Sequence, residues 1–538
     1  MSSTDIIVKN RFLGFLIWQW IHSTAIFIIF KTIFLLPFIT ANPFTPSLVG
    51  CLAFLAFHLT LLLFSASVFI VASPQPDRAA SPLEIALGLV RLVLTSSEST
   101  PDFRHRAKIS LSFVLLVTSC ALSGFVSVVS LCWANSDAFD GVLGLIGRVG
   151  LKGFACGLLY GLYYVFKKRW VLEFPIIQRP LFFSFKMGLP SAIRQALKLS
   201  SVAYLFSTLL VVFLPDQFKS HRTVGKFIVE QVIFYIGSFA VFLCWELSHH
   251  LHQVLHTKRF VFAPPKGSAA AETNPSEPLL AALEESTLGS LLQYLAYLDL
   301  CMVCENNVDT WRRAAFFEET GETYKRVVAV CLRPLEHLAS KLGEGLESCS
   351  VDNSNQLSHQ LRSPTDSGPD SKFYESFNHF QLCVWSARAV ASLTAHSHKE
   401  DRFGVAQLSG SNAAVISTLL SCLLAVEMFM GKKTNLPSPH HLMGPAGIKW
   451  ATPNTRREAV RGIINKKKGG PLHSKAYSMA DILRTSVYCI VSAFHDEMLA
   501  SAKSGVLDKD WVISSKPHYG TRELLLQKLR LFLDFRAI

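Results

Sequence analysis

Two cysteines in the second half of the chain have a spacing that occurs in metal sites. Cys301 and Cys304 form a CxxC pair inside the apolar stretch LAYLDLCMVCENN. A structural zinc site takes four ligands, and no second CxxC supplies the other two. Two thiols three residues apart on a helix are more often packed in a core. The pair therefore favours core packing over metal binding.

Three histidines form a second candidate metal site. His249, His252 and His256 recur at helical spacing after an apolar run, and His252 with His256 could bind a metal on one face. No carboxylate or cysteine is placed to complete the ligand set. An interfacial histidine cluster beside the basic residues Lys258 and Arg259 is the favoured interpretation, so the sequence predicts no metal and no other cofactor.

Three charged residues lie inside long apolar runs. Arg148 and Lys152 are one helical turn apart, and Glu230 lies at a comparable depth in a later run. Charges in such runs are expensive in a membrane and usually have partners. The three residues could form an ion or proton path. We favour an ion pair that fixes helix register, because no ladder of acidic residues accompanies them.

The chain carries no recognisable catalytic signature. HExxH, GxSxG, a Walker loop and GxGxxG followed by a strand are all missing from the sequence. His495, Asp496 and Glu497 form only a polar stretch on an amphipathic helix. The sequence therefore predicts a protein that is not an enzyme, with no catalytic residues.

The composition is that of a membrane protein. Of 538 residues, 50% are hydrophobic and only 17% are charged, and the mean hydropathy is +0.33. The formal net charge of +13 is interleaved with apolar runs, which indicates membrane topology rather than direct binding of nucleic acid. Six runs are long enough to cross about 30 Å of hydrocarbon. They are Phe12 to Phe38, Ser47 to Val71, Ser110 to Trp133, Val142 to Phe166, Ile193 to Leu214 and Phe227 to Leu247.

The distribution of lysine and arginine predicts the orientation of these spans. Sixteen of these residues lie in segments on the side of the N-terminus, and only Lys219, Arg222 and Lys226 lie on the opposite side. Basic residues accumulate on the cytosolic side of membrane proteins. Both termini are therefore expected in the cytosol, with the first span retained as a signal anchor.

Three glycines in the fourth span recur every four residues. Gly153, Gly157 and Gly161 line one helix face with hydrogen atoms and let another helix approach closely. We favour another span of this chain as the partner, and a second molecule is the alternative.

The long apolar runs end near Phe260, and a different pattern of apolar residues follows. Residues 1–260 form the predicted membrane domain, 261–279 a linker rich in Pro, Ser, Ala and Glu, and 280–538 a helical cytosolic domain. Apolar residues recur at three- and four-residue steps, with almost no alternation typical of strands. Helices are expected at about Leu279 to Val303, Thr310 to Glu319, Tyr324 to Leu342, Phe373 to Leu393, Met479 to Met498 and Thr521 to Phe535. Polar loops are expected at 348–371 and 431–474.

One apolar segment of this second half could be a seventh span. Ala413 to Met430 is apolar nearly all round, with Glu427 as its single charge. Ser417, Thr418 and Ser421 dilute its hydrophobicity, so we favour a buried core helix. The predicted fold class is therefore all-α, with six transmembrane helices followed by an all-helical domain.

Two segments carry a resemblance to a known family. LAYLDLCMVCENNVDTWRRAAFFEETGETYKRVVAVCLRPLEHL (Leu295 to Leu338) follows the linker, and EDRFGVAQ (Glu400 to Gln407) leads into the apolar helix. With six spans before them, they resemble the nuclear-division-cycle transmembrane nucleoporins of the pore membrane. EDRFGVAQ is similar to the family's E-D-x-x-G-x-x-Q turn before a core helix.

The resemblance implies a protein of the nuclear envelope, at the nuclear pore membrane, that takes part in nucleocytoplasmic transport of mRNA and protein. It implies a non-enzymatic anchor for the pore scaffold that assists pore assembly and insertion. Expected partners are the WD-repeat nucleoporin Aladin, inner-ring scaffold nucleoporins, other pore-membrane proteins and membrane lipids. The alternative is a polytopic transporter or channel that uses the charged residues of spans four and six.

Overall fold

The protein is described here by a computed structural model of the chain. It describes residues 3–35, 48–76, 101–132, 139–175, 177–212, 224–265, 267–352, 375–432 and 471–536, together with the single residues 79, 84 and 373. The described parts are helical and contain no strand, which confirms the predicted all-α class. One isolated parallel bridge joins Ser73 to Val171. The chain divides into two compact units, Met1–Arg259 and Phe260–Ile538, which are described separately.

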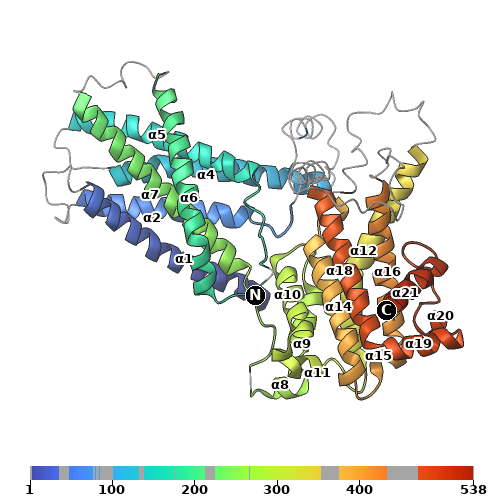
Figure 1. Cartoon of the computed structure of the whole chain (residues 1–538). Coiled ribbons are helices and arrows are strands. Elements are labelled where there is room, and N and C mark those ends of the chain that lie inside the picture. The colour runs from blue at the N-terminus through green and yellow to red at the C-terminus, as the bar shows by residue number, and fades with distance from the viewer. Residues whose placement is uncertain are drawn as a thin grey trace, which may run out of the picture. The chain divides into compact units, whose positions relative to one another are not determined.

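The first unit contains long apolar helices (Figure 1). They are α1 (Ser3–Ile29) with its π-helical continuation η1 (Phe30–Leu35), α2 (Leu48–Val71), α4 (Pro101–Cys132), α5 (Phe139–Phe166), α6 (Leu181–Val212) and α7 (Val224–His256). Their core is aromatic: the ring of Trp245 stacks on Phe64 with centroids 5.4 Å apart and lies 4.9 Å from Tyr160. Large apolar side chains such as Leu59 and Leu205 are exposed. An apolar exterior around a packed interior is what lipid requires of a membrane domain.

Among the residues that the structure describes, six helices are long and apolar enough to cross a membrane, and five of them overlap predicted spans. These five are Ile6–Ile33, Gly50–Val71, Phe103–Cys132, Val149–Phe166 and Ile228–His256. The predicted fifth span, Ile193 to Leu214, lies on α6. Arg194 and Lys198 interrupt its apolar run, which continues beyond the described residues, so α6 is not among the six. Its crossing stays a prediction.

The sixth helix by these criteria is Ser411–Gly431, in the second unit. Within this unit, 78% of its apolar window is buried, against 22% to 56% for the other five helices. It is covered by helices that are amphipathic or polar: α12 (Glu322–Asp352), α14 (Phe380–Glu400), α18 (Pro471–Ala493) and α21 (Arg522–Arg536). A helix wrapped by such neighbours cannot face lipid unless they enter the bilayer with it. The burial supports a core helix rather than a seventh span.

The second unit is a bundle built around this helix, α16 (Figure 1). Its helices are α8 (Ala269–Thr273), α9 (Glu277–Glu285), α10 (Leu291–Glu305), η4 (Asn307–Asp309), α11 (Thr310–Ala314), α12 (Glu322–Asp352), α14 (Phe380–Glu400), α15 (Val405–Leu408), α16 (Ser411–Lys432), α18 (Pro471–Ala493), α19 (His495–Ser504), α20 (Leu507–Asp510) and α21 (Arg522–Arg536).

Three of the predicted helices in this unit are broken where single helices were expected. Phe373 to Leu393 is interrupted by a turn at 377–379, and α14 begins at Phe380. Leu279 to Val303 is interrupted between α9 and α10, where Gly289 has a φ of +79° and the Ser290 hydroxyl caps α10. A serine that caps the next turn stops one helix and starts another. The Met479 to Met498 segment breaks at Phe494, between α18 and α19. Thr310 to Glu319 is helical only to Ala314.

The glycine face of α5 lies against α4 of the same chain. A Cβ atom built on Gly157 would lie 2.1 Å from the carbonyl oxygen of Cys120, and one on Gly153 would lie 2.5 Å from that of Gly124. At Gly161 the nearest atom is the Cα of Val117, at 3.0 Å. The two backbones are therefore too close for any side chain at Gly157.

We predict that Gly157→Ala destabilises the full chain by about 1–3 kcal/mol, because the added methyl group forces α4 and α5 apart. Thermal unfolding in detergent measures the change. Gly14→Ala is the matched control, since a Cβ at Gly14 meets nothing within 4 Å. Equal melting temperatures for the two variants would contradict the close approach.

Candidate functional site

The CxxC pair lies in the core of the second unit. Cys301 and Cys304 are both buried, and burial raises the pKa of each thiol. A thiol that resists deprotonation is a poor metal ligand. Across the described residues, no group of three or more His, Cys, Asp or Glu side chains could hold a metal ion.

The three predicted histidines lie near the end of α7 and have different neighbours. The rings of His252 and His256 stack with centroids 4.1 Å apart, and Phe15 of α1 meets His252 edge-on at 5.6 Å. His249 Nδ1 lies 3.2 Å from the hydroxyl of Tyr164. The pair is therefore enclosed by aromatic side chains within the membrane unit.

The charged residues predicted to pair inside the spans lie on α5 and α7. Lys152 is buried, and its ammonium donates to Gln231 Oε1 at 3.3 Å and lies 5.0 Å from the centre of the Phe234 ring. Gln231 follows Glu230 in the chain. The side chain of Arg148 lies outside the described residues. A register-fixing pair that includes Arg148 and Glu230 stays a prediction.

A buried ion pair that the sequence analysis missed lies at the end of the same two helices. Arg169, just after α5, forms a bidentate pair with Glu246 of α7, with Nη2 to Oε2 at 2.8 Å. Glu246 is 2% exposed. An acidic residue in the last turn of a predicted span, opposite the run Lys167-Lys168-Arg169, was the signal that could have revealed it.

Two adjacent arginines hold the second unit together. Arg312 pairs with Asp299 of α10 at 2.8 Å and also donates to the carbonyl oxygen of Phe262, while the Phe262 N–H donates to Asp299. Arg313 Nε donates to Glu400 Oε2 at 2.9 Å. Both guanidinium groups are almost fully buried, so these contacts fix where α10, α11 and α14 meet.

The segment EDRFGVAQ is a turn in which each patterned residue has a contact. Glu400 pairs with Arg313, and Asp401 Oδ2 accepts the Ala406 N–H at 2.8 Å. Gly404 has a φ of +68°, which a side chain would strain. Gln407 Nε2 donates to Glu497 Oε2 at 3.1 Å, linking α15 to α19. The turn thus positions the start of α16.

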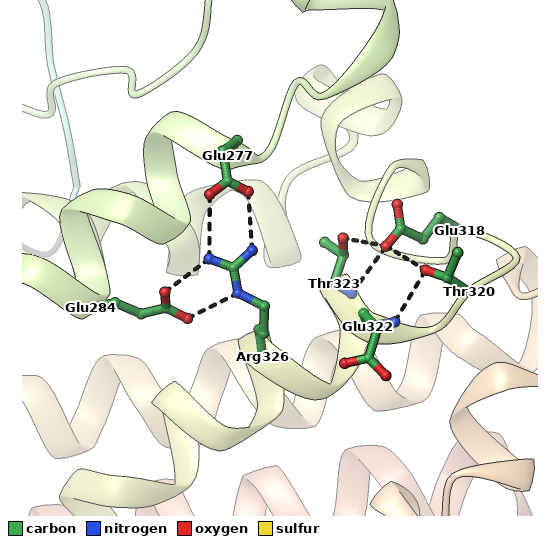
Figure 2. A network of polar contacts seen from close by, with 7 residues as sticks. All are labelled: Glu277, Glu284, Glu318, Thr320, Glu322, Thr323 and Arg326. Atoms are coloured by element: carbon green, nitrogen blue, oxygen red, sulfur yellow. Dashed lines mark hydrogen bonds and ion pairs between the residues drawn. The ribbon is translucent and has the colours of Figure 1, made fainter.

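A third arginine cluster lies at the surface of this unit, and Figure 2 shows it. Arg326 of α12 donates to Glu277 and Glu284 of α9, with distances of 2.8–3.3 Å. Beside it, Glu318 accepts from the hydroxyl and backbone N–H of Thr323. The hydrogen bond with Arg326 lowers the pKa of Glu284, so the pair is ionised at neutral pH.

The fold defines the chain as an all-helical polytopic membrane protein with a second, helical unit. Residues 371–499 match the family model described as nucleoporin protein Ndc1-Nup. This match supports an Ndc1-type transmembrane nucleoporin family for the chain, and it confirms the resemblance seen in the sequence. No curated protein matches the chain.

The family implies a nucleoporin of the nuclear pore membrane that associates with other pore components, and it suggests a structural role. The matched residues run from just before α14 into the first half of α19, all within the second unit. They include the EDRFGVAQ turn and the buried helix α16.

Removing a buried arginine should destabilise the protein far more than removing an exposed one. Arg312→Met leaves Asp299 charged and buried, so we expect a loss of about 3–5 kcal/mol. Arg326→Met is the matched control, and its half-exposed pairs predict a loss of at most about 1 kcal/mol. Denaturant unfolding of the full chain, followed by tryptophan fluorescence, gives both values. Similar losses of stability for Arg312→Met and Arg326→Met would contradict the larger contribution expected from the buried pair.

Proposed function

We propose that the protein anchors the nuclear pore scaffold in the nuclear envelope and assists pore assembly and insertion. In this proposal the first unit holds the chain in the bilayer, and the second unit docks soluble scaffold proteins. The chemistry is binding, without turnover of a substrate.

One observation carries the proposal: the family match lies wholly in the second unit. The first unit exposes apolar side chains around a packed interior, as lipid requires. The second unit buries its most apolar helix, α16, and presents amphipathic helices around it. A chain with one lipid-adapted unit and one water-adapted unit is suited to joining a membrane to a soluble assembly.

The partners that the resemblance implies fit this division. The WD-repeat nucleoporin Aladin and the inner-ring scaffold nucleoporins would dock on the second unit, and other pore-membrane proteins would contact the first. The linker between them, residues 261–279, carries the short helix α8. Both termini would lie on the cytosolic and pore side, as the distribution of lysine and arginine predicts.

Truncation after Phe260 tests the docking role. We expect the truncated protein to remain in the membrane fraction and to lose scaffold nucleoporins, measured by affinity purification from cells. A chain whose residues 434–470 are replaced by a short Gly-Ser linker is the control, because it keeps every described helix. A truncated protein that still recovered the scaffold proteins would refute docking by the second unit.

The orientation has its own test. Epitope tags at both termini should react with antibody after selective permeabilisation of the plasma membrane, whereas a tag inserted after Asp216, in a loop predicted on the far side, should react only after full permeabilisation. Super-resolution imaging of the C-terminal tag should give puncta that coincide with a pore scaffold marker. Reactivity of the loop tag under selective conditions would overturn the six-span topology.

A further inference from the structure

A large cavity opens at one end of the first unit. Its volume is about 780 Å³, within the range of small-molecule sites. The walls come from the end of α5, the segment 171–179 that follows it, the first turns of α6 and the last turns of α7. The predicted fourth and sixth spans end at Phe166 and Leu247, so the cavity opens beside the ends of these two predicted spans.

The charged residues that line the cavity are mainly cationic. Lys167, Lys168, Arg169, Arg179 and Lys258 face it, together with the acids Glu173 and Glu246. Arg169 is engaged by Glu246. Within the part of the chain that the structure describes, the ammonium groups of the three lysines form no ion pair. Their charge is available to an anion.

The cavity wall is held in place before any ligand arrives. The Glu173 N–H donates to Gln253 Oε1 at 3.1 Å, and Gln253 Nε2 donates to the carbonyl oxygen of Val171 at 3.0 Å. The Arg259 N–H donates to Gln178 Oε1 at 3.1 Å. These contacts tie the segment after α5 to the end of α7. A ligand that binds there pays little to order the site.

Lys168 adds a strained backbone to the rim. Its φ is +52°, and it is the one residue other than glycine with a positive φ among the described residues. The Lys168 N–H donates to Val165 O and the Arg169 N–H donates to Tyr164 O, which closes the end of α5 in the pattern where glycine is usual. Lys168 therefore occupies a backbone position where glycine is usual, and its side chain lines the cavity.

Exposed apolar side chains lie on the elements that form the cavity, and Ile177 and Met187 also line it. Phe166 is 81% exposed at the end of α5, and Phe182, Phe183 and Met187 are exposed on the first turns of α6. Ile177 is exposed on the connecting segment. A free anion makes no use of this surface, whereas acyl chains do. A cationic cavity next to exposed apolar side chains suits an anionic lipid, whose headgroup is charged and whose acyl chains are apolar.

We propose that this cavity binds the phosphate headgroup of an anionic membrane lipid, with the acyl chains lying along the exposed face of α6. The headgroup class is a phosphate monoester, since its charge of about −1.5 to −2 suits several lysines better than a singly charged diester. Lys167, Lys168 and Lys258 bind its oxygens. The site joins α5, α6 and α7 at their ends, so an occupied cavity braces the membrane unit.

The test uses the full chain in detergent and a fluorescent phosphatidic acid as the probe. We expect saturable binding, and we expect Lys168→Gln/Lys258→Gln to weaken it about twentyfold, roughly fivefold for each lysine. Lys108→Gln/Lys186→Gln is the matched control. It removes the same charge from exposed positions on the same predicted side that do not line the cavity, and it should leave affinity within about twofold. Equal weakening by both pairs would show a diffuse surface attraction and overturn the site.

Competition separates a lipid from a free phosphate. Unlabelled phosphatidic acid should displace the probe, while inorganic phosphate and glycerol 3-phosphate at the same concentration should not. Displacement by the soluble phosphates would overturn the lipid assignment, as would equal displacement by phosphatidylcholine.

A single variant guards against a loss caused by misfolding. Lys168→Gly removes one charge and relieves the strained turn. We expect an unchanged or higher melting temperature without lipid and a smaller rise when phosphatidic acid is added. An undiminished rise would show that Lys168 does not contact the headgroup.

Discussion

Hydrocarbon offers no hydrogen-bond partners, and the first unit is organised by that constraint. Its backbone is satisfied within long helices, and its polar side chains turn inward: Gln19 reaches Leu61 O and Ser248, and Thr60 bonds Ser127. With no hydrophobic drive between helices in lipid, close packing has to hold them together. The contact of Gly153 and Gly157 with α4 supplies that packing, because bare backbones bring many atoms within van der Waals range.

The same constraint gives Glu246 its importance. A carboxylate in the last turns of an apolar helix needs a partner, and Arg169 provides it from the turn after α5. To place Arg169 there, the chain reverses through Lys168 in a left-handed conformation. The pair therefore fixes the exit of α5 against α7. The cavity beside it is also lined by the first turns of α6, the helix that contains Pro190.

The sequence predicts those features that are periodic along one helix. Apolar run length predicted the helical class and five of the helices that could span, and the polar residues Ser417, Thr418 and Ser421 favoured α16 as a core helix rather than a seventh span. The EDRFGVAQ pattern led to the family, and two of its patterned residues, Asp401 and Gly404, serve a local turn. In these cases the determining residues lie within a few positions of one another.

Contacts between distant residues were not predictable in this way. The four-residue spacing of glycines shows that one face of α5 carries no side chains. Which helix packs against that face depends on contacts across the unit. The Arg169–Glu246 pair spans 77 positions, and Arg313–Glu400 spans 87. A charge pattern reports that a partner is needed without naming it. For the same reason the basic run after the fourth span first indicated only orientation, whereas in three dimensions it lines a cavity with the end of α7.

The two units place their buried charges in contrasting ways that follow from their surroundings. In the second unit Arg312 and Arg313 each donate to a backbone carbonyl as well as to a carboxylate. Their buried guanidinium groups therefore fix the end of α10 and the segment around Phe262. In the first unit the buried pair lies at a helix end, where unpaired lysines remain close to the aqueous boundary. Buried ion pairs in the second unit hold its helices in fixed positions. Lysines without ion pairs beside the cavity leave positive charge in the first unit that can attract anionic lipids.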